Sequence, residues 1–263
     1  NISSNTFDSG NTFIMLMLQS GQDIYNEDLY TTDYNGIKTS DIKNLNLTNF
    51  MTQDSIRVFE QWTKFYTVFS FDQTFDAFSR FRTGEMPLVI QPYTFYNQLS
   101  VAAPEIKGLW DFTLVPGTKQ ADGTINHAAN SAGSGAVIFN KVSNQAAAWD
   151  FVKWFTSTDI QVDYGKQIEA LMGPMGRFDT ANVEALEQLP WSTAEYEKIS
   201  SQQSYLKEVP IIPASYAVTR HVNNAFRMVV NDAGNPRYTL MSYNDQIKSE
   251  IVRKYQELSS VKK

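Results

Sequence analysis

The sequence contains no cysteine, only two histidines and no long apolar run. The lack of cysteine excludes disulfides, thiolate metal sites and cysteine catalysis. The histidines, His127 and His221, stand far apart and show no zinc-binding spacing, so the sequence indicates neither a metal site nor a metal hydrolase. No segment approaches the roughly 20 apolar residues of a membrane-spanning helix. Because the chain starts at Asn1 without a signal peptide or a lipidation cysteine, we expect a trimmed chain.

Basic residues are fewer than acidic residues. Lysine and arginine number 22 against 28 acidic residues, which gives a net charge of −6, and the basic residues are scattered. A surface for nucleic acid would need clustered basic residues, so we expect no nucleic-acid partner. With 263 residues, 42% of them hydrophobic, the chain can bury a sizeable core in one large or two modest domains.

Apolar residues recur at helical spacing in several parts of the chain, and these parts predict helices. Residues 12–19 form an apolar segment ended by Ser20 and Gly21. A second helix is predicted from Thr52 onward, and the last one opens at Asn235 and Pro236, a cap residue followed by proline in the first turn. Two further helices are predicted around Phe75–Phe81, halted at Gly84, and around Val222–Val230.

Three short apolar segments, 86–93, 110–115 and 136–139, predict strands. Two helices are expected after the third strand. The first spans 146–155, and the second begins near Thr158, which has the spacing of a capping box with Gln161. Beyond them, Gly165, Gly173 and Pro190 are expected to break the chain into short helices.

The most informative segment is 130–165, "NSAGSGAVIFNKVSNQAAAWDFVKWFTSTDIQVDYG". Its order of small-residue turn, apolar segment and two helices resembles the crossover segment of extracellular solute-binding proteins that serve ABC-type importers, in the branch that carries sugars and oligosaccharides. Three more segments resemble the same family: "DAFSRFRTGEMPLVIQPYTFYNQL", "LWDFTLVPGTKQADGTINH" and the stretch that begins "VPIIPASYAVTRHVNNAF". Together the four cover about residues 11–255 in the family's order.

The resemblance implies a helix-rich α/β fold like that of type-II periplasmic binding proteins. Residues 1–130 and 191–263 would form the C-terminal lobe. Residues 131–190 would supply the hinge crossover and the late segment of the N-terminal lobe. Members of the family normally have a further stretch before the position of Asn1, so we expect this chain to lack its N-terminal segment.

Aromatic residues are the first candidates for ligand contacts, because flat rings stack on the C–H faces of sugars. Tyr93 stands where the family has the tryptophan of its "G-P-W" motif, and Tyr216 matches the aromatic residue that closes the cleft. Arg220 follows four residues later and has the donors to bind sugar hydroxyls or a carboxylate. The residues alone leave open that Tyr93 is a packing residue and that Arg220 is simply solvated.

The small-residue turn suits a hinge, because glycine permits unusual backbone angles and lets a ligand approach main-chain amides. It has no Walker-type Lys-Ser/Thr and precedes a predicted strand, so it does not indicate a phosphate site. Weaker family matches come from the N-terminus and from the cleft rim. The hinge candidates are Ser131, Gly133 and Ser134. The N-terminal candidates are Asp8, Asn11 and Phe13, and the candidate at the cleft rim is Met172.

The resemblance therefore predicts non-covalent binding of a sugar or oligosaccharide in an interlobe cleft, for delivery to the permease subunits of an ABC transporter. We expect a monomer without cofactor, on the extracellular or periplasmic face of a bacterial cell, a lipoprotein anchored through the missing N-terminus. Two alternatives stay open: a carbohydrate-active enzyme, and an interaction module that has lost transport. Asp72, Asp76, Glu85 and Asp111 are available as carboxylates, but none has a recognisable catalytic context, so we predict no enzyme and no catalytic residue.

Overall fold

The computed structural model describes residues 9–131, 133 and 135–261, which form two compact units. Unit 1 comprises the described residues of Asn1–Ala77, Pro116–Ser131 and Leu206–Lys263. Unit 2 comprises those of Phe78–Val115 and Ala132–Tyr205. These bounds are not the bounds of the predicted lobes, so the lobe assignment stays a prediction, and each unit is described by itself.

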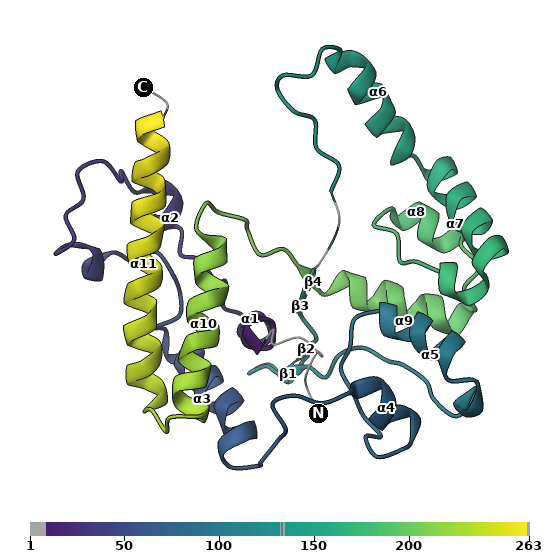
Figure 1. Ribbon diagram of the computed structural model, residues 1–263, viewed down its shortest axis with the longest axis horizontal. Helices are drawn as coiled ribbons and strands as arrows, with labels where there is room; N and C mark the ends of the chain where they lie inside the picture. Colours follow the sequence, from purple (N-terminus) through teal and green to yellow (C-terminus); the bar gives the residue numbers. More distant parts are fainter. Residues whose placement is uncertain (1–8, 132, 134, 262–263) are drawn as a thin grey trace. The chain divides into compact units, whose positions relative to one another are not determined.

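Unit 1 is built mainly of helices (Figure 1). Its long helices are α1 (Ser9–Gln19), α3 (Gln53–Thr67), α10 (Ser215–Val230) and α11 (Pro236–Val261), and its short ones are α2 (Asp28–Thr31) and η1 (Ile42–Asn44). Two sheets of two strands complete it: β1 (Thr118–Lys119) pairs antiparallel with β2 (Ile125–Asn126), and β3 (Ala129–Asn130) pairs parallel with β4 (Leu206–Lys207).

Aromatic rings from three helices form the centre of unit 1. The indole of Trp62 on α3 lies 4.4 Å from the ring of Phe226 on α10 and stacks at 5.7 Å on Phe13 of α1. All three side chains are buried almost completely. Leu240, Ile247 and Ile251 add the buried face of α11, which runs beside α10 (Figure 1). Burial of such large apolar groups is the main driving force for folding.

The helix ends of unit 1 follow the sequence signals. Thr52 caps α3, because its hydroxyl accepts a hydrogen bond from the Ser55 amide at 3.2 Å. The Asn235 side chain accepts from the Tyr238 amide at 3.1 Å, just where α11 begins. The turn after α1 contains Gly21 with φ of +80°, an angle that favours glycine. The predicted helices at 12–19, after Thr52, around Val222–Val230 and after Asn235 are therefore confirmed.

Gln19, at the end of α1, joins this helix to the β1–β2 hairpin. Its side chain is buried and donates hydrogen bonds to the carbonyls of Pro116 and Ala128 at 3.0 and 3.1 Å. It also accepts one from the Thr118 hydroxyl at 3.0 Å. A buried amide is stabilising only when its donors and acceptor are satisfied, so Gln19 specifies how the hairpin docks.

Unit 2 contains helices and, among its described residues, no strand. They are α4 (Ala77–Arg82, whose first residue belongs to unit 1), α5 (Thr94–Ala102), η2 (Pro104–Ile106), α6 (Gln145–Phe155), α7 (Thr158–Met172), η3 (Gly173–Gly176), α8 (Val183–Gln188) and α9 (Thr193–Ser204). The core of the unit forms where α7 packs on η3 and α8, and where η3 packs on α5.

The three predicted strands are wrong for the described residues. Segments 86–93, 110–115 and 136–139 form no strand. Leu88 is 79% exposed and Val137 is 78% exposed, so these apolar runs are not buried as the prediction requires. An apolar run becomes a buried strand only where neighbouring strands complete its hydrogen bonds. The fold is accordingly richer in helix, and poorer in sheet, than predicted.

Two local predictions in 158–190 also need correction. Ser157, not Thr158, precedes α7, and no side-chain cap is formed. The side-chain amide of Gln161 instead donates to the Phe155 carbonyl at 2.7 Å. Gly165 lies inside α7 and does not break it. It allows close packing, because a Cβ at this position would lie 2.4 Å from Cδ2 of Leu189. The predicted break at Gly173, with φ of +64°, is confirmed.

Helix α6 forms as predicted but has no buried residue. Its indoles Trp149 and Trp154 are 56% and 53% exposed, and the rings of Phe151 and Phe155 are exposed as well. Short helices in water depend on tertiary packing for most of their stability, so an exposed aromatic face on a helix of this length is unusual. Across the described ranges, no helix is long and apolar enough to span a membrane.

His221 is a buried ionisable group of unit 1. It lies on α10, and neither ring nitrogen has a hydrogen-bond partner among the described residues. Burial lowers the pKa of His221, and the charge of Arg220 lowers it further, while Glu250 acts in the opposite direction. The imidazole is therefore harder to protonate in the folded chain than in the unfolded chain.

We predict that this histidine makes unit 1 less stable in acid. The unfolded chain has a histidine pKa of about 6.5, above that of folded His221, so the unfolded state binds the proton first as the pH falls below that value. The loss amounts to about 1.4 kcal/mol for each pH unit that separates the two pKa values. Urea unfolding at pH 7.5 and pH 5.5 should show a smaller loss for His221→Phe than for the wild type. Equal losses in both proteins would contradict the prediction.

Candidate functional site

The predicted hinge residues lie where the chain leaves unit 1. The amide of Ser131 donates to the carbonyl of Lys207 at 3.1 Å, which continues the pairing of β3 with β4. Gly133 and Gly135 are exposed, with open space where a side chain would stand. Ser134 lies outside the described residues, as does Asp8. Ser131 is the last residue of its segment of unit 1, and the hinge role of the predicted crossover stays a prediction.

The weaker candidates are found in different surroundings. Phe13 has no exposed surface and stacks on Trp62, so its described contacts are those of a core residue. Asn11 is exposed near the start of α1. Met172 ends α7 and is half-exposed. Asn11 and Phe13 belong to unit 1, and Met172 belongs to unit 2.

Tyr216 and Arg220 are brought together on α10. Both lie in the first turns of that helix, four residues apart, which places them on one face. The Arg220 guanidinium lies 5.5 Å from the centre of the Tyr216 ring. The tyrosine side chain remains 50% exposed. Helix α10 begins at Ser215, so Tyr216 belongs to its first turn.

Two residues of α11 complete this surface. Glu250 faces Tyr216, with its carboxylate 3.3 Å from the phenol oxygen, and lies 3.6 Å from the Arg220 guanidinium. Arg253 forms a closer ion pair with the same carboxylate and donates to the Tyr216 hydroxyl at 3.3 Å. The hydrogen bond from Arg253 is the main reason that the pKa of Glu250 is lowered, and partial burial opposes it. We call these four residues the Tyr216 surface.

The chemistry of the Tyr216 surface suits a polar ligand with an apolar face. A half-exposed aromatic ring offers a stacking surface, and the surrounding arginines and carboxylate offer hydrogen-bond donors and acceptors. Glu250 is already paired with Arg253, so Arg220 at 3.6 Å is held less tightly. Arg220 is therefore the member of the group with the most freedom to bind something else.

Tyr93 lies in a second, more enclosed group of aromatic residues in unit 2. It directly precedes α5. Its ring stacks on Tyr96 at 5.6 Å and contacts Trp191 edge-on at 5.5 Å. Its hydroxyl is buried, and burial is the main reason that the pKa of Tyr93 is raised. These contacts are those of a packing residue, which was the alternative open for Tyr93 from the sequence.

Arg177 joins three elements around these rings. Its Nε donates to Glu169 of α7 at 2.8 Å, and its Nη1 donates to the Tyr96 hydroxyl of α5 at 2.9 Å. That hydroxyl in turn donates to Glu195 of α9 at 2.6 Å. The guanidinium also lies 5.6 Å from the Trp191 ring. Charge-assisted hydrogen bonds of this kind are stronger than neutral ones, and their geometry is specific.

The pKa directions agree with this network. Burial lowers the pKa of Arg177, but the hydrogen bond to Glu169 and the neighbouring acidic groups outweigh it, so the net shift is upward. Burial would raise the pKa of Glu195, yet hydrogen bonds from Tyr96 and Ser192 hold it below its usual value. The pKa of Tyr96 is raised, first by burial and then by its bond to Glu195. All three groups therefore keep one protonation state near neutral pH.

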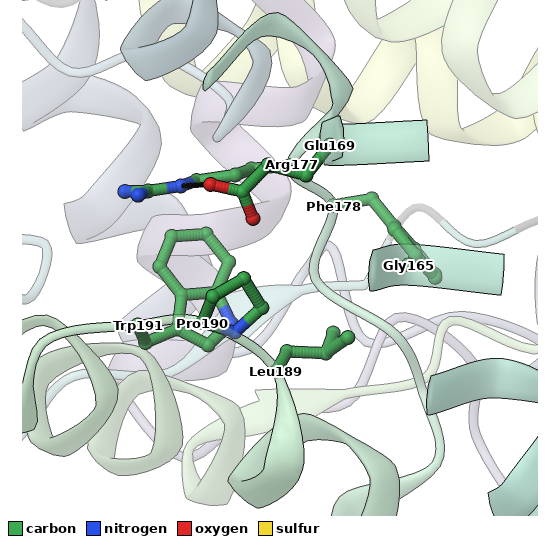
Figure 2. Close-up of a pocket in the computed structure, with 7 residues that line it drawn as sticks. All are labelled: Gly165, Glu169, Arg177, Phe178, Leu189, Pro190 and Trp191. Atoms are coloured by element: carbon green, nitrogen blue, oxygen red, sulfur yellow. Dashed lines mark hydrogen bonds and ion pairs between the residues drawn. The ribbon is translucent and has the colours of Figure 1, made fainter. Parts of the chain in front are cut away.

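A small pocket opens beside this network (Figure 2). The Glu169 carboxylate lies between the Arg177 side chain and the rings of Pro190 and Trp191 in that view. The space that the centre of a water-sized sphere can reach is about 10 Å³, close to the minimum for one water. Pockets for sugars or drug-sized ligands are far larger, about 300–1,000 Å³. Gly165, Phe178 and Leu189 complete the lining.

Sequence reasoning missed most of the partners in both groups. Glu250 and Arg253 around Tyr216, and Arg177, Glu195 and Trp191 around Tyr93, come from distant parts of the chain. One signal was readable: Ser192 and Glu195 have the spacing of a capping box, and the structure forms it at the start of α9. In the part of the chain that the structure describes, no group of three or more histidine, aspartate or glutamate side chains is placed to hold a metal ion.

Comparisons with known proteins agree with this fold. The family model for bacterial extracellular solute-binding proteins matches residues 3–162, more than half of the chain. A solved structure, described as an ABC transporter solute-binding protein from Thermotoga lettingae TMO bound with α-D-tagatose, is similar in fold with a TM-score of 0.64 at 15% identity. The match covers 94% of this chain but 57% of that protein, so the chain spans little more than half of the relative's length. No curated protein matches the chain.

We predict that Arg177→Met destabilises unit 2 by about 2–4 kcal/mol, because Glu169 and Glu195 would lose the cation that compensates their partly buried charges. The side chains of Arg177 and Glu169 are only 21% and 17% exposed. Urea unfolding followed by circular dichroism measures the change.

Arg57→Met is the matched control for this substitution. Its ion pair with Asp54 has side chains that are 68% and 44% exposed, so we expect a change below about 1 kcal/mol. Equal losses in the two variants would refute a stabilising role of the Arg177 network.

Proposed function

Because the chain belongs to the bacterial extracellular solute-binding protein family, we propose that it binds a sugar or an oligosaccharide non-covalently for delivery to the permease of an ABC importer. The match to the family over residues 3–162 is the observation that carries the proposal. The similar fold of a protein solved with α-D-tagatose favours a carbohydrate among the possible solutes. Members of this family are typically not enzymes, and no chemical step is part of the proposal.

The Tyr216 surface supports a carbohydrate ligand. Its phenol ring is half-exposed and borders on Arg220, Glu250 and Arg253. Sugar recognition combines an aromatic face with polar groups held in place around it, and all of these are present here. Helices α10 and α11, which carry these four side chains, pack against each other.

The exposed aromatic face of α6 supports the proposed lobe assignment. In that assignment residues 131–190 pack on strands of the first lobe, and the described residues of unit 2 form no strand. Trp149, Phe151 and Trp154 would then be covered by that sheet. The proposed location is the extracellular or periplasmic face of a bacterial cell, where a solute-binding protein meets its permease, with closure about the hinge setting the affinity.

The proposal is tested by calorimetric titration of the natural polypeptide that contains residues 1–263. The ligands are tagatose, common monosaccharides and a series of oligosaccharides, and released reducing ends are assayed in parallel. Saturable heat without product supports a binding protein. Release of reducing ends would show the alternative, a carbohydrate-active enzyme, and a lack of binding across the panel would refute sugar binding.

We predict that Tyr216→Ala weakens binding of the best sugar in this panel by about 1–3 kcal/mol, the loss expected for an aromatic contact residue. Tyr238→Ala is the matched control, because Tyr238 is also an exposed tyrosine of unit 1 but lies at the start of α11 and outside the Tyr216 surface. Calorimetry on both variants measures the difference. Equal affinities for the two variants would exclude Tyr216 from the binding site.

Tyr93→Ala separates the two interpretations of Tyr93. If the ring stacks on the sugar, affinity falls by about 1–3 kcal/mol at temperatures where the variant stays folded. If Tyr93 serves packing with Tyr96 and Trp191, the melting temperature falls and the affinity of the folded protein is unchanged. Thermal unfolding and calorimetry on the same preparation distinguish these results.

A further inference from the structure

Buried polar atoms without a partner are concentrated around Arg177. Among the described residues, seven buried side-chain nitrogen and oxygen atoms have no hydrogen-bond partner, and four of them belong to Tyr93, Asn97, Glu169 and Trp191. All four residues contact the Arg177 network or lie next to it. Buried polar groups in proteins are hydrogen-bonded as a rule, so a cluster of exceptions indicates something that binds there.

Two of these atoms belong to residues that line the pocket of Figure 2. They are Oε2 of Glu169 and Nε1 of Trp191. An indole N–H only donates and a carboxylate oxygen only accepts. The other carboxylate oxygen, Oε1, is already held by Arg177 at 2.8 Å, and Figure 2 shows one oxygen of this carboxylate turned toward the side of Pro190 and Trp191. The pocket is thus bordered by one donor and one acceptor that need different partners.

The size and the charges of the pocket select its ligand. The space of about 10 Å³ admits about one water and no sugar. A cation is disfavoured by the Arg177 guanidinium and cannot accept from the indole N–H. An anion is disfavoured by the Glu169 carboxylate. Water is the small molecule that accepts one hydrogen bond and donates another in the same place.

We propose that this pocket binds one ordered water, which accepts a hydrogen bond from Nε1 of Trp191 and donates one to Oε2 of Glu169. The water links α7 to the segment that precedes α9. It fixes the orientation of the Trp191 ring, against which Tyr93 and Tyr96 pack edge-on at 5.5 and 6.1 Å. This internal water is a positioning element for the aromatic group of unit 2, and it is independent of whether the protein transports a sugar.

Nuclear magnetic resonance of the full chain with ¹⁵N-labelled tryptophan tests the proposal. The chain has five tryptophans, and Trp191→Phe assigns the indole N–H signal of Trp191 by its loss. We expect a cross-peak between the Trp191 indole proton and a slowly exchanging water. Trp62 is the matched control, because its indole nitrogen is also buried without a hydrogen-bond partner but is packed among the rings of Phe13, Phe59 and Phe226 and does not line the pocket. We therefore expect no water cross-peak there.

Glu169→Gln provides a second readout that does not depend on the loss of the indole. The amide of glutamine is a weaker partner for the water than the carboxylate, because hydrogen bonds to charged groups are about twice as strong as neutral ones. The Trp191 indole signal should therefore shift and exchange with solvent faster, by roughly tenfold. A high-resolution crystal structure should show density at hydrogen-bond distance from both atoms. Absence of the cross-peak, or a direct contact between Glu169 and Trp191 in the crystal, overturns the proposal.

Discussion

One guanidinium organises unit 2, whose described residues form no strand. Arg177 bonds to Glu169 and Tyr96, and through Tyr96 it reaches Glu195, so a single side chain connects α5, α7 and α9. Partly buried charges of this kind stabilise a fold only when each is paired and held in good geometry. That requirement fixes the positions of the aromatic rings nearby. It also leaves the small polar pocket beside the network, whose proposed water would complete the remaining hydrogen bonds.

In unit 1 the helices are held together mainly by apolar packing. Trp62, Phe13 and Phe226 form a continuous stack across three helices, and polar side chains such as Gln19 connect the helices to the hairpin. The contrast matters for function. Unit 1 displays Tyr216 and Arg220 on the surface of a helix that packs on its core, whereas Tyr93 in unit 2 is enclosed by its own neighbours. A ligand-binding role is therefore supported by the surroundings of Tyr216 more directly than by those of Tyr93.

Family membership indicates the class of protein, and local chemistry indicates which ligand could bind. The match over residues 3–162 establishes which proteins this chain belongs with, and the fold similarity reaches 57% of the solved relative. Neither comparison identifies a ligand for this chain. The Tyr216 surface and the exposed rings of α6 are features of the molecule itself, and they support the proposed sugar ligand and the proposed lobe assignment.

The sequence by itself determined the family and the main helices, because helical periodicity and caps such as Thr52 and Asn235 depend on neighbouring residues. It misassigned segments 86–93, 110–115 and 136–139, since a strand exists only when another strand pairs with it. Tertiary structure alone decided which partners surround Tyr216 and Tyr93. Glu250 and Trp191 reach them from 34 and 98 positions away, and separations of that length leave no local pattern to read.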